Sequence, residues 1–276
     1  MSLFVASLNS GSNGNCYYVG NEQEAILIDA GISCKEIEKR LLQLNLEVQK
    51  IKAVFISHEH SDHIKGISVL SKKYQLPVYI TQPTLQNGRL ALQNELVQSF
   101  VANESISIGA LTIIPFAKQH DAIDPYSFSI LCDEVRVGVF TDIGMPCKNL
   151  IAHFHLCHAA FLESNYDEEM LEKGAYPLHL KNRIREGKGH LSNIQALALF
   201  TAHHPSFMSH LFLAHLSKNN NHPDLVMNLF QSHSKGVEII VASRNEPTKL
   251  YEVKNPSVSR KIISTRRMVQ AKLAFD

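Results

Sequence analysis

The sequence predicts a sandwich of mixed β-sheets covered by helices, a fold of the α+β class. Short apolar runs rich in β-branched residues alternate along the chain with segments of helical periodicity. Tight turns, such as the one at residues 20–23 (GNEQ), join some of the runs, and such turns connect antiparallel strands. A purely parallel sheet with helical crossovers is therefore not expected.

The predicted elements follow one another from the first strands to the last helix. Strands are expected at residues 25–29, 53–58, 111–120, 135–142, 158–163 and 210–215, and helices at residues 35–44, 64–74, 192–200 and 223–230. The first helix places Ile37, Leu41 and Leu44 on one face. The third begins after a favourable N-cap residue, Ser192, and the fourth carries Pro223 in its first turn.

We expect one domain over residues 1–276, because the chain shows no linker, internal repeat or low-complexity run. Its composition, 45% hydrophobic and 19% charged, is that of an ordinary globular protein. Residues 255–276 are expected to form a basic C-terminal helix or tail. Its cations are Arg260, Lys261, Arg266, Arg267 and Lys272.

Charge and cysteine content restrict the partners and the compartment. The formal net charge of +1 excludes a globally basic surface, so nucleic acid would have to bind at a local patch. The five cysteines form no CxxC pair, which favours reduced thiols in the cytoplasm. The N-terminus lacks signal-peptide features and no run is long enough to span a membrane, so we expect a cytoplasmic protein without a membrane partner. The oligomeric state stays open.

Each predicted strand ends in a side chain that can bind a metal or carry a proton. These residues are Asp29, His58, His120, Asp142, Glu163 and His215. Strands fix side-chain positions better than mobile loops do, so groups at their ends can converge on one site.

The densest cluster of such residues is HEHSDH at residues 58–63. His58 and His60 can point the same way from an extended loop, while Asp62 and His63 reach a second point, and two metal ions are commonly about 3.5–4 Å apart. His120 would complete the first site, His215 the second, and Asp142 would bridge them. Imidazole with carboxylate favours two zinc ions, with manganese or iron as alternatives.

The motif HEHSDH fits the HxHxDH signature of the metallo-β-lactamase superfamily, whose members are αββα-sandwich hydrolases. The resemblance covers roughly residues 3 to 245 and includes Asp29, His120, Asp142 in TDIG and His215 in LAHLS in the family's order. Antibiotic-hydrolysing members usually carry a cysteine at the position of Asp142, which disfavours β-lactam hydrolysis. Asp29 would lie behind the ligands and orient the histidine loop through hydrogen bonds.

A narrower resemblance points to phosphodiester chemistry. The segments FLESNY and GHLSN resemble the Glu and His loops of ribonuclease Z and related phosphodiesterases. Together with SLNSGSNGNCYYV, QHDAIDP, YPLHLKNRI and LAHLSKNNN they resemble the YycJ (WalJ) subfamily, a bacterial group associated with DNA exonuclease activity. The implied mechanism has a metal-bridging hydroxide attack phosphorus, with Asp62 taking its proton. His190, held by Glu163, would protonate the leaving group.

Basic residues before His190 are candidate contacts to nucleic acid: Lys181, Arg183, Arg185 and Lys188. They are equally consistent with a solvated loop. We expect a metal-dependent nuclease, with DNA preferred over RNA and cleavage from an end preferred over internal cleavage, and both choices stay open at this point. The alternatives are a small-molecule phosphodiesterase, for example on cyclic nucleotides, and a non-catalytic metal-binding module.

Overall fold

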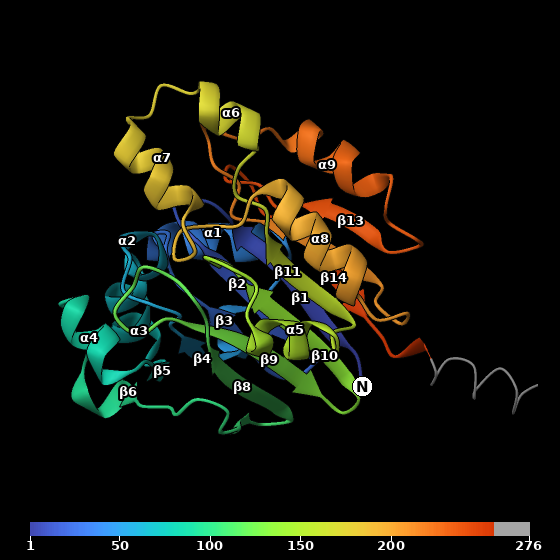
Figure 1. The fold of residues 1–276 in the computed structure, drawn as a ribbon. Helices are drawn as coiled ribbons and strands as arrows, with labels where there is room; N and C mark the ends of the chain where they lie inside the picture. Colours follow the sequence, from blue (N-terminus) through green and yellow to red (C-terminus); the bar gives the residue numbers. More distant parts are fainter. Residues whose placement is uncertain (257–276) are drawn as a thin grey trace, which may run out of the picture.

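The computed structural model describes residues 1–256, and these residues build two facing mixed sheets (Figure 1). The first seven-stranded sheet contains, in spatial order, β14 (Tyr251–Val253), β1 (Leu3–Asn9), β2 (Cys16–Gly20), β3 (Ala25–Ile28), β4 (Ile51–Phe55), β5 (Val78–Tyr79) and β6 (Val97–Gln98). The second contains β13 (Glu238–Val241), β12 (His210–Ala214), β11 (Ala159–Glu163), β10 (Val135–Phe140), β9 (Tyr126–Cys132), β8 (Leu111–Ala117) and β7 (Ile106–Ile108).

Each sheet joins an antiparallel half to a parallel half. In the first sheet β1, β2 and β3 pair antiparallel, whereas β3 to β6 pair parallel. In the second sheet β7 to β10 pair antiparallel and β10 to β13 pair parallel. The predicted turn at residues 20–23 links β2 to β3, where the Asn21 side chain accepts from the backbone N–H groups of Gln23 and Glu24. The prediction of mixed sheets is confirmed.

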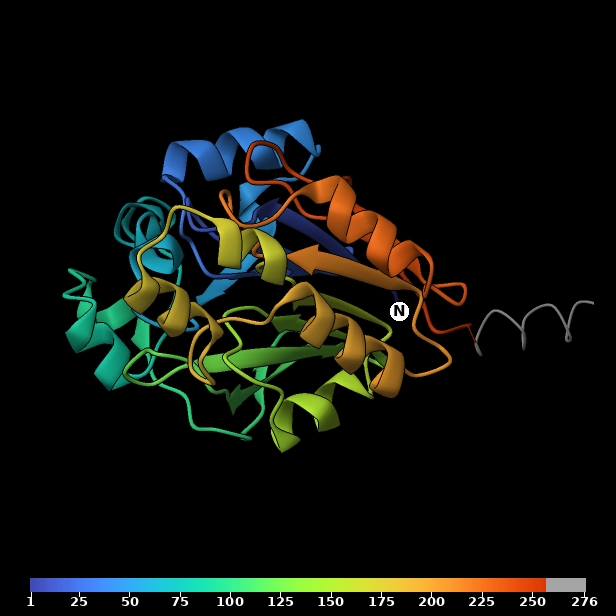
Figure 2. The same cartoon turned by 45° about the horizontal axis from the view of Figure 1, so that its top comes forward.

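Helices cover both outer faces of the sandwich (Figures 1 and 2). The helices are α1 (Cys34–Gln43), α2 (Ser61–Ile64), α3 (Ile67–Tyr74), α4 (Gln82–Asn87), α5 (Lys148–Phe154), α6 (Glu168–Lys173), α7 (Leu178–Arg185), α8 (Asn193–His203) and α9 (Pro223–Gln231), with 3₁₀ turns at Val48–Lys50 and Asn94–Leu96. One apolar cluster lies between the sheets. A second joins α1 and α3 to the first sheet, and a third joins α5, α8 and α9 to the second sheet.

The predicted helices are present with local signals that explain their ends. Ser192 caps α8 through a capping box with Gln195, and Pro223 opens α9. In α1 the predicted face is buried at Ile37 and Leu41. The single helix expected at residues 64–74 is instead divided into α2 and α3, because the Gly66 N–H leaves the helix and bonds to the Ala30 carbonyl.

The carboxyl ends of β3, β4, β8, β10, β11 and β12 lie at one end of the sandwich, because these strands run in the same direction within their sheets. Helices α6 and α7 lie outside the two layers at this end (Figures 1 and 2). Within residues 1–256 no helix is long and apolar enough to cross a membrane. The predicted basic segment 255–276 falls outside the described residues, apart from its first two positions.

Candidate functional site

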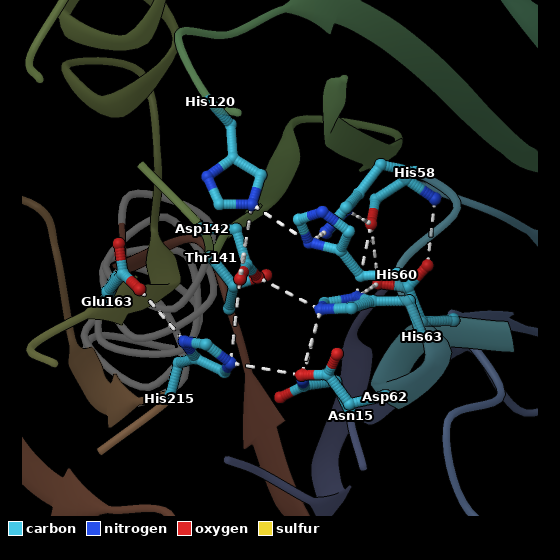
Figure 3. Close-up of polar contacts among 12 residues, drawn as sticks. Asn15, His58, His60, Asp62, His63, His120, Thr141, Asp142, Glu163 and His215 are labelled. Carbon is cyan, nitrogen blue, oxygen red and sulfur yellow. Dashed lines mark hydrogen bonds and ion pairs between the residues drawn. The ribbon is translucent and has the colours of Figure 1, made fainter. Parts of the chain in front are cut away.

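The polar side chains that follow the strands converge at this end of the sandwich (Figure 3). Groups of histidine and carboxylate ligand atoms lie within 4.8 Å of one another there. The residues involved are His58, His60, Asp62, His63, His120, Asp142, Glu163, His190 and His215. The sequence-based expectation that strand ends meet at one site is therefore met by the geometry.

Three histidines form a first cluster. The Nδ1 atom of His60 lies 3.1 Å from Nε2 of His58 and 3.3 Å from Nε2 of His120. The other ring nitrogens are occupied, since His120 Nδ1 donates to the Gly189 carbonyl at 3.1 Å and His58 Nδ1 lies 2.9 Å from the Ser57 hydroxyl. Three imidazole nitrogens thus face one point, the arrangement of a nitrogen-liganded metal site.

The second cluster joins Asp62, His63 and His215. Oδ2 of Asp62 lies 3.5 Å from Nε2 of His63 and 3.5 Å from Nε2 of His215. Asp142 stands between the clusters, with Oδ2 3.2 Å from His63 Nε2 and Oδ1 3.5 Å from His215 Nε2 and 3.8 Å from His120 Nε2. A carboxylate in this position can contact both clusters.

The donor set fits a pair of divalent cations. Within residues 1–256 the buried Oδ2 atom of Asp142 forms no well-oriented hydrogen bond, and it faces His63 Nε2 at 3.2 Å as an ion pair. A buried carboxylate is costly unless a positive charge balances it, and a divalent cation at this point would do so in place of the protonated His63 ring. Nitrogen and carboxylate ligands together are those that zinc prefers.

Two histidines of the first cluster, His58 and His120, are neutral at physiological pH. Burial, together with the neighbouring His63, holds the pKa of His58 well below its usual value. Burial also lowers the pKa of His120 to about 4, although the Asp142 carboxylate opposes the shift. Neutral imidazole is the form that binds a metal ion, so these rings need lose no proton to do so.

The second cluster holds charge in the absence of metal. Burial disfavours protonation of His63, but Asp142, Asp29 and Asp62 raise its pKa well above the usual value. For His215 burial is likewise outweighed by Asp142 and by hydrogen bonds to carboxylates, which raise its pKa to about 10. The pKa of Asp142 falls well below its usual value, because the nearby histidines outweigh its burial.

Asp29 forms hydrogen bonds with two residues of the histidine loop, Ser57 and His63. Its Oδ2 accepts from His63 Nδ1 at 2.7 Å and from the Ser57 hydroxyl at 2.8 Å, while Oδ1 accepts from the Ser57 N–H at 2.8 Å. The contact orients His63 so that Nε2 faces Asp62 and Asp142.

Three of the site residues have left-handed backbone conformations. They are Asp29 (φ 62°), Asp142 (φ 55°) and His215 (φ 57°). Each lies at or just beyond a strand end, where the chain must turn sharply and aim its side chain inward. Such conformations cost on the order of 1–3 kcal/mol each and persist where surrounding contacts hold them, often at functional sites.

Glu163 has more partners than the sequence suggested. Its Oε1 accepts from Nδ1 of His190 at 2.8 Å and from Nδ1 of His215 at 2.9 Å. Its Oε2 accepts from the backbone N–H groups of Ile143 and Leu191 at 2.6 and 3.2 Å. Burial opposes ionisation of Glu163, but the two histidines lower its pKa to about 2. The pairing of Glu163 with His190 was expected, and that with His215 was not.

Gly31 allows the loop after β3 to reach the start of α2. A Cβ atom at this position would lie 1.6 Å from the Asp62 carbonyl oxygen. The Asp62 carbonyl also accepts from the Asn15 N–H at 2.7 Å. Only glycine permits this approach, which fixes the backbone that carries Asp62 and His63.

Two buried polar residues at the site were missed by the sequence analysis. The Asn15 side chain donates to Asp62 Oδ2 at 3.1 Å, and Lys118 Nζ donates to the Thr141 carbonyl at 2.7 Å, next to Asp142. Asn15 sits in a turn whose sequence gives no sign of this contact. Lys118 could have been found, because it lies two residues before His120, and residues two apart in an extended segment share a face.

The predicted basic residues lie beside the site but have partners of their own. Arg183 pairs with Asp121 (2.5 Å) and Arg185 with Glu172 (2.9 Å), while Lys181 donates to the Glu172 carbonyl. Lys188 is exposed in the loop after α7. The stretch is a helix for most of its length, and of the four cations only Arg183 lines the pocket that contains His190.

The pocket at the site has a volume of about 230 Å³. On one side it is lined by His60, Asp62, Asp142, His190 and His215. Tyr176 and the α7 residues Leu180 and Ile184 supply an apolar wall. A small substrate group with a polar and an apolar side fits such a pocket.

Comparison with known proteins agrees with this site. Residues 10–100 match the model of the metallo-β-lactamase superfamily. The chain is 33% identical to exodeoxyribonuclease YycJ of Bacillus anthracis over 82% of this chain and 86% of the relative. It is 31% identical to exodeoxyribonuclease WalJ of Streptococcus pneumoniae (strain D39) over 79% and 83% of the two chains.

A solved structure shares the fold across the sandwich. The zinc-bound PqqB of Methylobacterium extorquens superimposes with a TM-score of 0.67 at 14% identity, over 89% of this chain and 99% of that one. The two seven-stranded sheets with their covering helices are thus the metallo-β-lactamase fold. The chain belongs to the metallo-β-lactamase superfamily, in which it is a metal-dependent hydrolase related to the exodeoxyribonucleases YycJ and WalJ.

Proposed function

We propose that the protein is a dinuclear metal-dependent nuclease that removes nucleotides from an end of DNA. One observation carries the proposal: His190 stands beside the metal-ligand clusters with Nδ1 fixed on Glu163 at 2.8 Å. Metal-assisted hydrolysis of an alkyl phosphodiester needs a proton donor for its poor leaving group, and this histidine is placed to be one. The names of the YycJ and WalJ relatives support DNA over RNA and an exonuclease over an endonuclease.

In this proposal His58, His60 and His120 hold one ion, and Asp62, His63 and His215 hold the other, with Asp142 between them. When bound, the two ions supply an activated water near neutral pH and electrostatic stabilisation of the phosphate oxygens. Zinc is the first choice on ligand chemistry, and the zinc-bound structural neighbour supports it. Manganese and iron are the alternatives to be tested.

Two side chains of the protein, Asp62 and His190, accept and donate the protons of the reaction. The Asp62 carboxylate accepts a proton from the attacking water while the oxygen of that water forms a bond to phosphorus. The bond from phosphorus to the sugar oxygen breaks, and His190 delivers a proton to that oxygen through Nε2, because Nδ1 is committed to Glu163. Glu163, with a pKa of about 2, stays ionised throughout and keeps the ring in one orientation.

A second candidate is a phosphodiesterase of small molecules such as cyclic nucleotides. The pocket volume of about 230 Å³ favours it, because a single nucleotide would fill the space. The same residues would perform the same chemistry on this substrate.

A substrate panel tests the proposal. Protein purified without chelator and loaded separately with zinc, manganese or iron is incubated with end-labelled duplex DNA, single-stranded DNA, RNA and a cyclic nucleotide. Stepwise shortening of DNA and two ions per chain by elemental analysis are expected. Cleavage confined to the cyclic nucleotide would transfer the assignment to the second candidate, and a single ion in excess metal would contradict the dinuclear site.

A further inference from the structure

A second cavity adjoins the metal pocket. Its volume is about 490 Å³, within the usual range of ligand pockets of about 300–1,000 Å³. It lies between the segment after β12, with Ser217 and Lys218, and the segment after β13, with Ser243 and Arg244. Ser217 lines both this cavity and the metal pocket. The two pockets are therefore neighbours, and a strand that leaves the metal pocket past Ser217 would reach the second cavity.

Arg244 is a half-buried cation in this cavity. Its Nη2 donates to the Leu216 carbonyl at 2.8 Å, and it forms no ion pair with any residue of the range 1–256. Burial lowers the pKa of Arg244. A guanidinium has five N–H donors, so the donors of Arg244 that do not bond to Leu216 can bond to an anion in the cavity.

The arginine is also held in place from two sides. Gly11, with φ +132°, lies so close that a Cβ atom there would be 2.9 Å from Arg244 Nη2. The Asn13 side chain donates to the Arg244 carbonyl at 3.0 Å. Between these two residues Ser12 lines the metal pocket. The loop after β1 thus packs on the arginine and reaches the metal pocket at the same time.

The cations of α7 contrast with this arrangement. Arg183 and Arg185 are paired with carboxylates, whereas neither Arg244 nor the exposed Lys218 has a carboxylate partner in the described part of the chain. An unpaired cation is available to a phosphate without first breaking an ion pair. The second cavity is therefore the better anion site beside the metal centre.

We propose that the second cavity binds a backbone phosphate of the DNA substrate. This phosphate belongs to the same strand as the phosphate that is cleaved and lies near it in the chain. Arg244 is its main contact and Lys218 a second cation. The proposal rests on the nuclease function proposed above. Arginine suits the role because its planar fork matches two phosphate oxygens at once. The site would add affinity for polymers over mononucleotide diesters and set the path of the strand.

Single-stranded oligonucleotides that carry one uncharged methylphosphonate linkage at successive positions test the proposal. In wild type, KM should rise when the neutral linkage occupies the second cavity. Arg244→Gln should raise KM for all-phosphate DNA about tenfold, as expected for a hydrogen bond to a charged group. In this variant KM should no longer depend on whether that one linkage is charged. The slope of log binding constant against log salt concentration should become less steep by about 0.7. Activity on bis(4-nitrophenyl) phosphate should be unchanged, and Arg244→Lys should recover part of the loss.

Arg136→Gln is the matched control. Arg136 is also half-buried and without an ion pair in residues 1–256, but it lies at the amino end of β10, away from the site. Its substitution should leave KM for DNA unchanged. A wild-type KM and an unchanged methylphosphonate profile in Arg244→Gln would overturn the phosphate site.

Fluorescence anisotropy of labelled single-stranded DNA separates this failure from failure of the nuclease function. If wild type cleaves no DNA but binds it, and Arg244→Gln weakens that binding about tenfold, the nuclease assignment falls and the phosphate site stands. If neither protein binds DNA, both proposals are overturned.

Discussion

The imidazole rings of His190 and His215 lie 5.2 Å apart between centroids, and both direct Nδ1 to the same oxygen, Oε1 of Glu163. His215 also faces Asp62 and Asp142 through Nε2, at 3.5 Å from each. One buried carboxylate therefore orients both a proposed metal ligand and the proposed proton donor. Metal binding and leaving-group protonation should depend on Glu163 together.

Glu163→Gln is expected to impair both functions. In all four of its hydrogen bonds Glu163 is the acceptor and a ring or backbone N–H is the donor. The side-chain NH₂ group of a glutamine at this position would therefore face another donor. Loss of such an outer contact typically weakens metal binding 10–100-fold. Chelator competition measures the affinity and DNA shortening measures the rate. Unchanged affinity in this variant would show that the carboxylate does not act through His215.

His190→Ala should affect the chemistry alone. General-acid catalysis contributes about 10²–10⁴-fold, so DNA cleavage should slow by that factor while elemental analysis still finds both metals. An aryl phosphodiester has a leaving group that needs no proton, so its cleavage rate should fall far less than that of DNA. Equal losses on the two substrates would reduce His190 to a positioning role.

Asp142 and Asp29 should differ in their effect on metal content. Asp142 touches both clusters, so Asp142→Ala should remove metal and strongly reduce turnover. Asp29 contacts His63 only from behind, so Asp29→Ala should weaken binding and leave part of the metal in place. Elemental analysis and rate are measured on the same samples. Two tightly held metals and a full rate in Asp142→Ala would disprove the bridging role.

Metal loading should release protons at neutral pH. Because the pKa of His215 is raised to about 10 in the metal-free protein, its ring carries a proton at pH 7 that a metal must displace. Apparent affinity should therefore increase as pH rises toward 10. His120, with a pKa of about 4, is already neutral and adds nothing above pH 6. Calorimetry in buffers of different ionisation enthalpy counts the protons, and an absence of buffer dependence would contradict this account.

Short-range features of the site were predictable from the sequence. The residues of HEHSDH are close in the chain, so local backbone geometry alone limits where His58, His60 and His63 can point. Ser192 and Pro223 act on the first turns of their own helices for the same reason. The resemblance to a family, whose matching positions follow the same order along this chain, also predicted the distant residues His120, Asp142 and His215 as ligands. Their ligand roles remain predictions.

Tertiary structure alone decided which distant groups share partners. Glu163 and His215 are 52 residues apart, and their contact depends on the parallel pairing of β11 with β12, which places Glu163 opposite Ala214. The pairing of Arg183 with Asp121 and the unpaired state of Arg244 within residues 1–256 likewise depend on how separate loops meet. Residue types and local spacing therefore determined the metal-binding chemistry. Sheet register and loop packing determined which carboxylate serves two histidines and which arginine is left to bind a substrate.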